Sequence, residues 1–238
     1  MTKLVKLAAS LVCLGLAACT HTGGMEPVTE LKPGTAWVLN SDDWASEARE
    51  VFAEATQHID AVEGERPDGS WYVVLDLDET VMNNVAYQVQ LDRTGTSYQS
   101  DTWFDWTQQE AATAVPGAIA FVNYVNSAGG HVVFVTNRRD TEQLATEVNL
   151  AKLGLLRGRD FRVLLTRASP EAPSSKEARF ALVPDMLEVQ GYPDTVALAY
   201  VGDAKGDRPA EWNPEAFFCI DNGAMYGDPC ASVPLSGR

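Results

Sequence analysis

Short apolar runs rich in β-branched residues alternate with helical segments along most of this chain. The runs occupy residues 71–75, 131–135, 162–165, 196–201 and 217–220. Strands that are apolar along their whole length are typical of a parallel sheet buried on both faces, because such a sheet carries helices on each side. The alternation therefore predicts an α/β fold with a Rossmann-like, mostly parallel sheet between two layers of helices.

Helical spacing of apolar residues and helix-boundary residues predict the segments between the strands. The expected helices cover about 42–59, 116–129 and 140–154, with a further stretch from about 174. Asp140 is the expected N-cap of the third helix, and Pro184 is expected to interrupt the last. The long excursion at 85–115 and the segment at about 41–66 are expected to form a small helical and aromatic accessory lobe.

The N-terminus has the pattern of an export signal. Lys3 and Lys6 precede an apolar run at 7–18, which at about a dozen residues is too short to span a bilayer. The small residues before Cys19 resemble a bacterial lipobox, which implies lipidation of Cys19 and an anchor in the outer membrane. The alternative is a secretory signal with an incidental cysteine. We expect a signal at 1–18, a lipidated tether at 19–40 and one domain at 41–238.

Charge and composition exclude several function classes. The formal net charge of −15 argues against binding to nucleic-acid polymers or to anionic lipid headgroups. With three His and four Cys that are not clustered, the chain offers few ligands for a zinc site and few residues for a histidine-centred catalytic triad. Cys219 and Cys230 would close a short loop in an oxidising compartment; the alternative is one buried and one exposed thiol.

Polar side chains follow the strand runs at the ends where ligands bind to open parallel sheets. They include Asp76 and Asp78, then Thr136, and then Asp203 and Asp207. Carboxylates brought together there would repel one another unless a cation lies among them, and hard oxygen ligands suit Mg²⁺. Lys176 is placed to reach the same crevice. A metal, a lysine and a hydroxyl make a phosphate site.

The spacing of Asp76 and Asp78 suggests a division of roles. One carboxylate attacks phosphorus and forms an aspartyl-phosphate, while the other protonates the leaving oxygen and later activates water. Arg138 and Arg139 follow the second strand, and we expect them to balance charge near the crevice without taking part in the chemistry.

These motifs, in this order and strand context, resemble those of the haloacid-dehalogenase-like phosphatases. The resemblance implies Asp76 as nucleophile, Asp78 as general acid/base, and Mg²⁺ as cofactor. It implies phosphate binding by Thr136, Asn137 and Lys176. The metal set that it implies is Asp76, the Asp78 main-chain carbonyl, Asp203 and, in support, Asp207.

Longer strings are similar to the bacterial outer-membrane lipoprotein acid phosphatases, a 5'-nucleotidase family in the class C acid phosphatase group. Examples are DLDETV at 76–81, VTNR at 135–138 and YVGD at 200–203. This resemblance implies a small-molecule phosphomonoester substrate and stacking of a nucleobase between Tyr98 and Tyr226, with Trp103 beside them. Alternatives are a phosphatase or phosphotransferase for non-nucleotide esters, and a catalytically silent surface or storage lipoprotein. The preferred ester and the oligomeric state stay open.

Overall fold

The computed structural model describes residues 30–64 and 66–231. The predicted signal at 1–18, the predicted lipidation site Cys19 and the first part of the predicted tether lie outside these residues. Within the described part, no helix has the length and apolar character needed to cross a bilayer.

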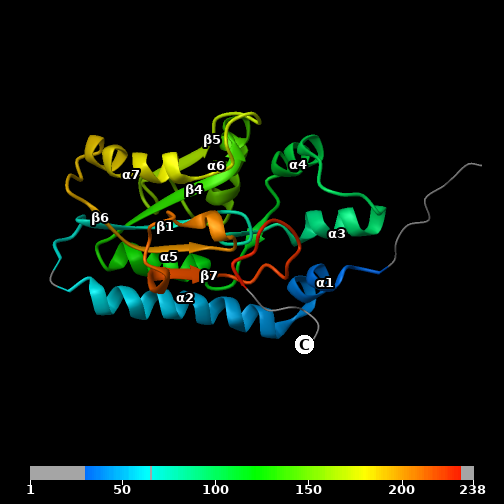
Figure 1. The fold of residues 1–238 in the computed structure, drawn as a ribbon, viewed down its shortest axis with the longest axis horizontal. Coiled ribbons are helices and arrows are strands. Elements are labelled where there is room, and N and C mark those ends of the chain that lie inside the picture. Colours follow the sequence, from blue (N-terminus) through cyan, green and yellow to red (C-terminus); the bar gives the residue numbers. More distant parts are fainter. Residues whose placement is uncertain (1–29, 65, 232–238) are drawn as a thin grey trace, which may run out of the picture.

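A five-stranded sheet with the order β5-β4-β1-β6-β7 forms the centre of the molecule (Figure 1), and all its strand pairs are parallel. The strands are β1 (Trp71–Leu75), β4 (His131–Arg139), β5 (Val163–Arg167), β6 (Val196–Gly202) and β7 (Phe217–Cys219). The central strand β1 is buried along its whole length. The predicted parallel α/β fold is confirmed.

Alternate residues of the strands pack into two cores, one on each face of the sheet. On one face, Val73 and Leu75 belong to the core that includes Phe52 and Phe121. These two aromatics come from α2 (Asp42–Val62) and α5 (Ala118–Ser127). On the other face, Val74 packs with residues of α7 (Glu177–Val189). The predicted layers of helices on both faces are therefore present.

The remaining helices, strands and turns lie between these elements along the chain or precede them. They are α1 (Pro33–Asn40), α3 (Val85–Thr94), α4 (Ser100–Thr107), α6 (Gln143–Lys152), β2 (Met82–Asn83), β3 (Thr113–Ala114) and the 3-10 turns Asp140–Glu142, Lys205–Asp207 and Pro214–Ala216. The strands β2 and β3 pair antiparallel at the base of the excursion. Figure 1 shows α3 and α4 beyond the ends at which the central strands terminate.

The expected boundaries need three corrections. Residues 33–40, expected in the tether, form α1, whose Val38 packs into the core. The segment from 41 to 62, expected in the accessory lobe, is α2 and lies against β6 and β7, because its apolar stripe needs a sheet face to cover. α7 continues through Pro184, since Val183 and Leu187 on either side are fully buried.

Local capping and one covalent link also shape the chain. Asp140 is not an N-cap: the Glu142 carboxylate instead accepts a hydrogen bond of 2.9 Å from the Arg139 backbone N–H. Cys219 and Cys230 form a disulfide that closes the loop after β7.

Candidate active site

Three buried carboxylates meet where β1 and β6 end. Asp76 follows β1, Asp203 follows β6, and Asp207 ends the 3-10 turn after it; one oxygen of each lies within 4.8 Å of the others. The side chains come together because neighbouring parallel strands end at the same edge of the sheet. The sequence predicted this convergence, and the structure shows it.

Lys176, at the N-terminus of α7, contacts this cluster. Its ammonium donates to Asp76 Oδ1 and, over 2.7 Å, to Asp207 Oδ1. The second oxygen of Asp207 accepts the backbone N–H groups of Asp203, over 3.1 Å, and Ala204, over 2.8 Å. Asp207 therefore positions both Lys176 and the loop that carries Asp203.

Gly202 makes this packing possible. A Cβ atom added to Gly202 would lie 2.2 Å from Cβ of Asp207. Any larger residue at 202 would push Asp207 away from the Asp203 loop, so the tight turn after β6 depends on this glycine.

The cluster carries an excess of negative charge and is largely buried. Burial raises the pKa of Asp76 to about 7, although the Lys176 ammonium opposes the rise, and burial also raises the pKa of Asp203 well above its usual range. Asn222 donates to Asp203 Oδ2 over 2.7 Å, and no sequence pattern had singled out this residue. Buried oxygen donors with uncompensated charge fit a metal ion, because a cation restores the balance.

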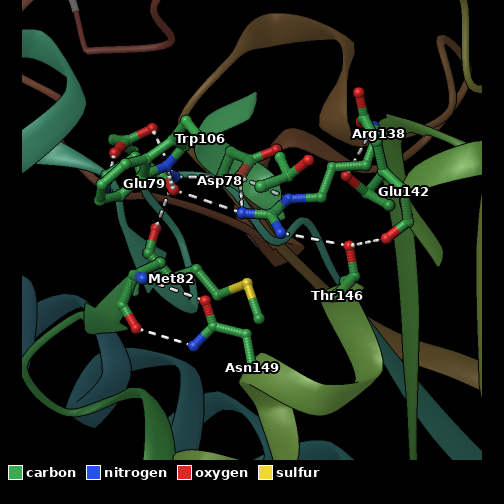
Figure 2. A network of polar contacts seen from close by, with 12 residues as sticks. Asp78, Glu79, Met82, Trp106, Arg138, Glu142, Thr146 and Asn149 are labelled. Carbon is green, nitrogen blue, oxygen red and sulfur yellow. Dashed lines mark hydrogen bonds and ion pairs between the residues drawn. The ribbon is translucent and has the colours of Figure 1, made fainter. Parts of the chain in front are cut away.

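Asp78 belongs to a second polar network, which joins it to Arg138 (Figure 2). Its Oδ1 accepts hydrogen bonds from Arg138 Nε (2.9 Å) and Nη2 (2.7 Å) and from Asn84 Nδ2 (3.0 Å). The two aspartates therefore lie in different surroundings although one residue separates them. This ion pair agrees with the expected charge balance by Arg138, and the sequence did not predict that its partner is Asp78.

A strand pattern would have pointed to Arg138. β4 runs on to Arg139, so Thr136 and Arg138 lie on the same side of the strand and both are buried, while Asn137 between them is exposed. The Thr136 hydroxyl accepts the backbone N–H of Arg138 over 3.1 Å. Asn137 Oδ1 accepts from Arg179 over 2.6 Å.

Two adjoining cavities open over these residues. A cavity of about 600 Å³ is lined by Asp76, Lys176, Asp203 and Asp207, and a second of about 390 Å³ is lined by Tyr98, Trp103, Gln88 and Arg138. Four residues line both cavities: Asp78, Asn137, Tyr226 and Gly227. The charged cavity and the aromatic cavity therefore meet at Asp78. Thr136 is fully buried and is not among the lining residues of either cavity.

The aromatic residues differ in exposure. Tyr98 is 56% exposed, whereas Trp103 is 8% exposed and packs edge-on against Tyr87 of α3. Trp106 is buried too, and its Nε1 donates to Asn84 Oδ1 over 2.9 Å. Tyr98, Trp103 and Tyr226 line the aromatic cavity, while Trp103 and Trp106 pack within the lobe.

A family model described as the HAD superfamily, subfamily IIIB (Acid phosphatase), matches residues 6–229. The chain belongs to this family. The fold is also similar to that of the class C acid phosphatase from Bacillus anthracis, with a TM-score of 0.67, 25% identity and coverage of 82% of this chain and 84% of that one. A structure of that phosphatase with tungstate bound gives a TM-score of 0.65 at 24% identity, with the same coverage.

Two curated soybean (Glycine max) proteins match over 132 residues at 24% identity. They are the stem 28 kDa and stem 31 kDa glycoproteins, and the match covers 55% of this chain and 51% and 44% of theirs. The chain thus spans about half the length of the curated relatives it matches.

Proposed function

We propose that this protein is a Mg²⁺-dependent acid phosphatase that hydrolyses phosphomonoesters, with 5'-nucleotides as the preferred class. The observation that carries the proposal is the meeting of the two cavities at Asp78. A phosphoryl group in the charged cavity, next to Asp76 and Lys176, would leave its ester substituent in the aromatic cavity. Membership of the acid phosphatase family supports the same chemistry.

The geometry supports a two-step transfer through Asp76. An Asp76 carboxylate oxygen attacks phosphorus, the bond from phosphorus to the ester oxygen breaks, and Asp78 gives a proton to the departing oxygen. Asp78 then takes a proton from water, which attacks phosphorus and releases inorganic phosphate from Asp76. Lys176 holds Asp76 in place and faces the phosphoryl oxygens, with Asn137 at the rim.

A magnesium ion would be held by the carboxylates of Asp76 and Asp203 and by the main-chain carbonyl of Asp78. Asp207 would hold Asp203 and Lys176, because both its oxygens already accept hydrogen bonds from these neighbours. The ion supplies positive charge that neutralises phosphoryl oxygens. Thr136 would bind a phosphoryl oxygen through its hydroxyl. Because this hydroxyl is buried and does not line the charged cavity, the phosphoryl group would have to approach it from the base of the site.

Nucleotide preference follows from the walls of the aromatic cavity. Tyr98 from the excursion and Tyr226 from the C-terminal loop would stack on the two faces of a base, with Trp103 at its edge. Stacking tolerates any base, so the proposal includes no preference among nucleotides.

We place the enzyme at the bacterial outer membrane, anchored by lipid on Cys19, with its domain in the periplasm or at the surface. The lipobox-like residues before Cys19 support this location. Metabolic labelling with a fatty-acid analogue tests it: the wild-type chain should carry the label and Cys19→Ala should not.

Phosphate release from a panel of nucleotides and small aryl phosphates tests the activity, with Mg²⁺ and with a chelator. We expect turnover that needs Mg²⁺ and is fastest with nucleotides. Asp76→Asn should lower turnover by at least about 10³-fold, as expected for loss of a nucleophile, with an unchanged circular dichroism spectrum. No release by the wild-type chain would indicate a silent scaffold, and a preference for non-nucleotide esters would remove the base-stacking assignment.

A further inference from the structure

Arg138 contacts the Asp78 carboxylate in an asymmetric way. Two of its nitrogens, Nε and Nη2, donate to the same oxygen, Oδ1, and Asn84 donates to that oxygen as well. Within the described residues, the hydrogen bonds to this carboxylate all fall on Oδ1. Asp78 also lines both cavities, and its side chain is 17% exposed.

The Arg138 side chain is itself held by its neighbours. It is 1% exposed, and its Nη1 donates over 3.2 Å to Thr146 of α6, whose hydroxyl donates on to the Glu142 carbonyl. Figure 2 shows the guanidinium between Thr146 on one side and Asp78 on the other. A buried guanidinium with a planar fork of donors loses little freedom when it makes such contacts, so it fixes the carboxylate that it meets.

Asn84 is fixed in the same manner. Trp106 donates to its Oδ1, and Glu79 accepts its backbone N–H over 2.6 Å. Glu79 takes a left-handed backbone conformation, with φ of 58°, in the turn directly after Asp78. Oδ1 of Asp78 is therefore held by Arg138 of β4, which Thr146 of α6 supports, and by Asn84 directly before α3.

We propose that Arg138 is a positioning residue that holds Asp78 by Oδ1 and so presents Oδ2 to the ester oxygen. The inference rests on the proposed phosphatase function and adds a residue to it. A proton moves from Oδ2 to the ester oxygen as the phosphorus–oxygen bond breaks, so the position of Oδ2 matters most when the leaving group is strongly basic. When the leaving group is weakly basic, it departs without that proton.

The test compares Arg138→Lys with the wild-type full chain on 4-nitrophenyl phosphate and phenyl phosphate. The two esters carry similar rings and differ in the basicity of the leaving oxygen, so base stacking does not enter. kcat/KM is the right measure because it reports the step in which the ester bond breaks. A ratio of two substrates on one preparation is also independent of the fraction of folded enzyme.

We expect Arg138→Lys to lower kcat/KM for phenyl phosphate by about 10²-fold, the lower end of general acid catalysis. The loss of kcat/KM for 4-nitrophenyl phosphate should be several-fold smaller. Asp78→Asn should change the ratio in the same direction and further. Arg139→Lys is the matched control, because Arg139 binds Glu142 and the Ser100 carbonyl; its ratio should equal that of the wild type.

Equal losses on both esters in Arg138→Lys would show a structural role and overturn the inference. That result leaves the proposed function intact, because the wild-type chain still hydrolyses the esters. If the wild-type chain released no phosphate from either ester, the proposed function would fail first.

Discussion

The carboxylate cluster and the aromatic cavity lie side by side, but different kinds of structure build them. The cluster residues Asp76 and Asp203 follow adjacent strands of the central sheet, and Lys176 begins a helix packed on it. The aromatic walls come from the excursion and from the loop that follows β7. The chemical groups are therefore fixed by the sheet, whereas the walls that would select a substrate rest on helices and a loop.

This difference teaches where each kind of change is tolerated. The sheet edge holds its charged groups largely buried, so removal of one partner leaves another charge buried without compensation. The aromatic cavity holds its contents by contact area and stacking, so loss of one wall removes only a share of the binding. The following predictions test this contrast, in order of decreasing effect.

Lys176→Met should cause the largest loss of stability. Lys176 is 4% exposed and pairs with Asp76 and Asp207, so its removal leaves their charges unbalanced. We expect the free energy of unfolding to fall by about 3–5 kcal/mol in metal-free buffer at neutral pH, measured by urea denaturation.

Lys205→Met is the control for that experiment. Lys205 also pairs with an aspartate, Asp228, but its side chain is 63% exposed. Loss of an exposed pair should cost less than about 1 kcal/mol. Similar losses of unfolding free energy in the two variants would show that burial does not make the Lys176 ion pairs contribute more than an exposed ion pair.

The same contrast explains how much of the molecule could be predicted from sequence. Apolar strand runs predicted the parallel sheet, and the polar residues that end them predicted the meeting of Asp76 and Asp203, because strand direction fixes that geometry. Lys176 joins them from the N-terminus of α7. Charge balance by Arg138 near the crevice was expected, but its direct contact with Asp78 was not, because β4 extends past its apolar run and its inward side continues into charged residues.

Other contacts had no sequence signal of their own. Asn84 and Asn222 reach Asp78 and Asp203 from turns whose paths depend on tertiary packing. The position of α2 against the sheet was also missed. Its amphipathic pattern predicts that one face of the helix is buried, but it does not identify the surface against which that face packs.

The disulfide provides a link between the two regions. The loop between Cys219 and Cys230 carries Asn222, which holds Asp203, and Tyr226, which borders both cavities. Replacing both cysteines by Ser should lower the free energy of unfolding by roughly 2–3 kcal/mol through the added freedom of the unfolded chain. A reductant should destabilise the wild-type chain and leave the stability of the double variant unchanged. If the reductant also destabilised the double variant, the effect could not be attributed to the bond between Cys219 and Cys230.

Tyr98→Ala should weaken nucleotide binding and leave the chemistry intact. Loss of one stacking wall is worth about 1–3 kcal/mol, which corresponds to a rise in KM of roughly 5- to 150-fold for a nucleotide. KM for a small aryl phosphate should change less, because its single ring offers less area than a nucleobase for stacking on Tyr98. The two substrates are compared on the same preparation, and equal effects on both would argue against a base held by Tyr98.

Asp92→Asn should have the smallest effect, on the attachment of the excursion to the N-terminal helix. Burial alone would raise the pKa of the Asp92 carboxyl, but hydrogen bonds from Thr35 and Lys32 and the charge of Lys32 hold it below its ordinary value. The carboxylate therefore adds stability at pH above the unfolded value of about 3.9, and this contribution disappears as pH falls through the lower folded value. We expect Asp92→Asn to cost about 1 kcal/mol at neutral pH and to match the wild-type chain in strong acid. A difference in unfolding free energy that stayed constant with pH would show that packing of the side chain, and not its charge, joins α3 to α1.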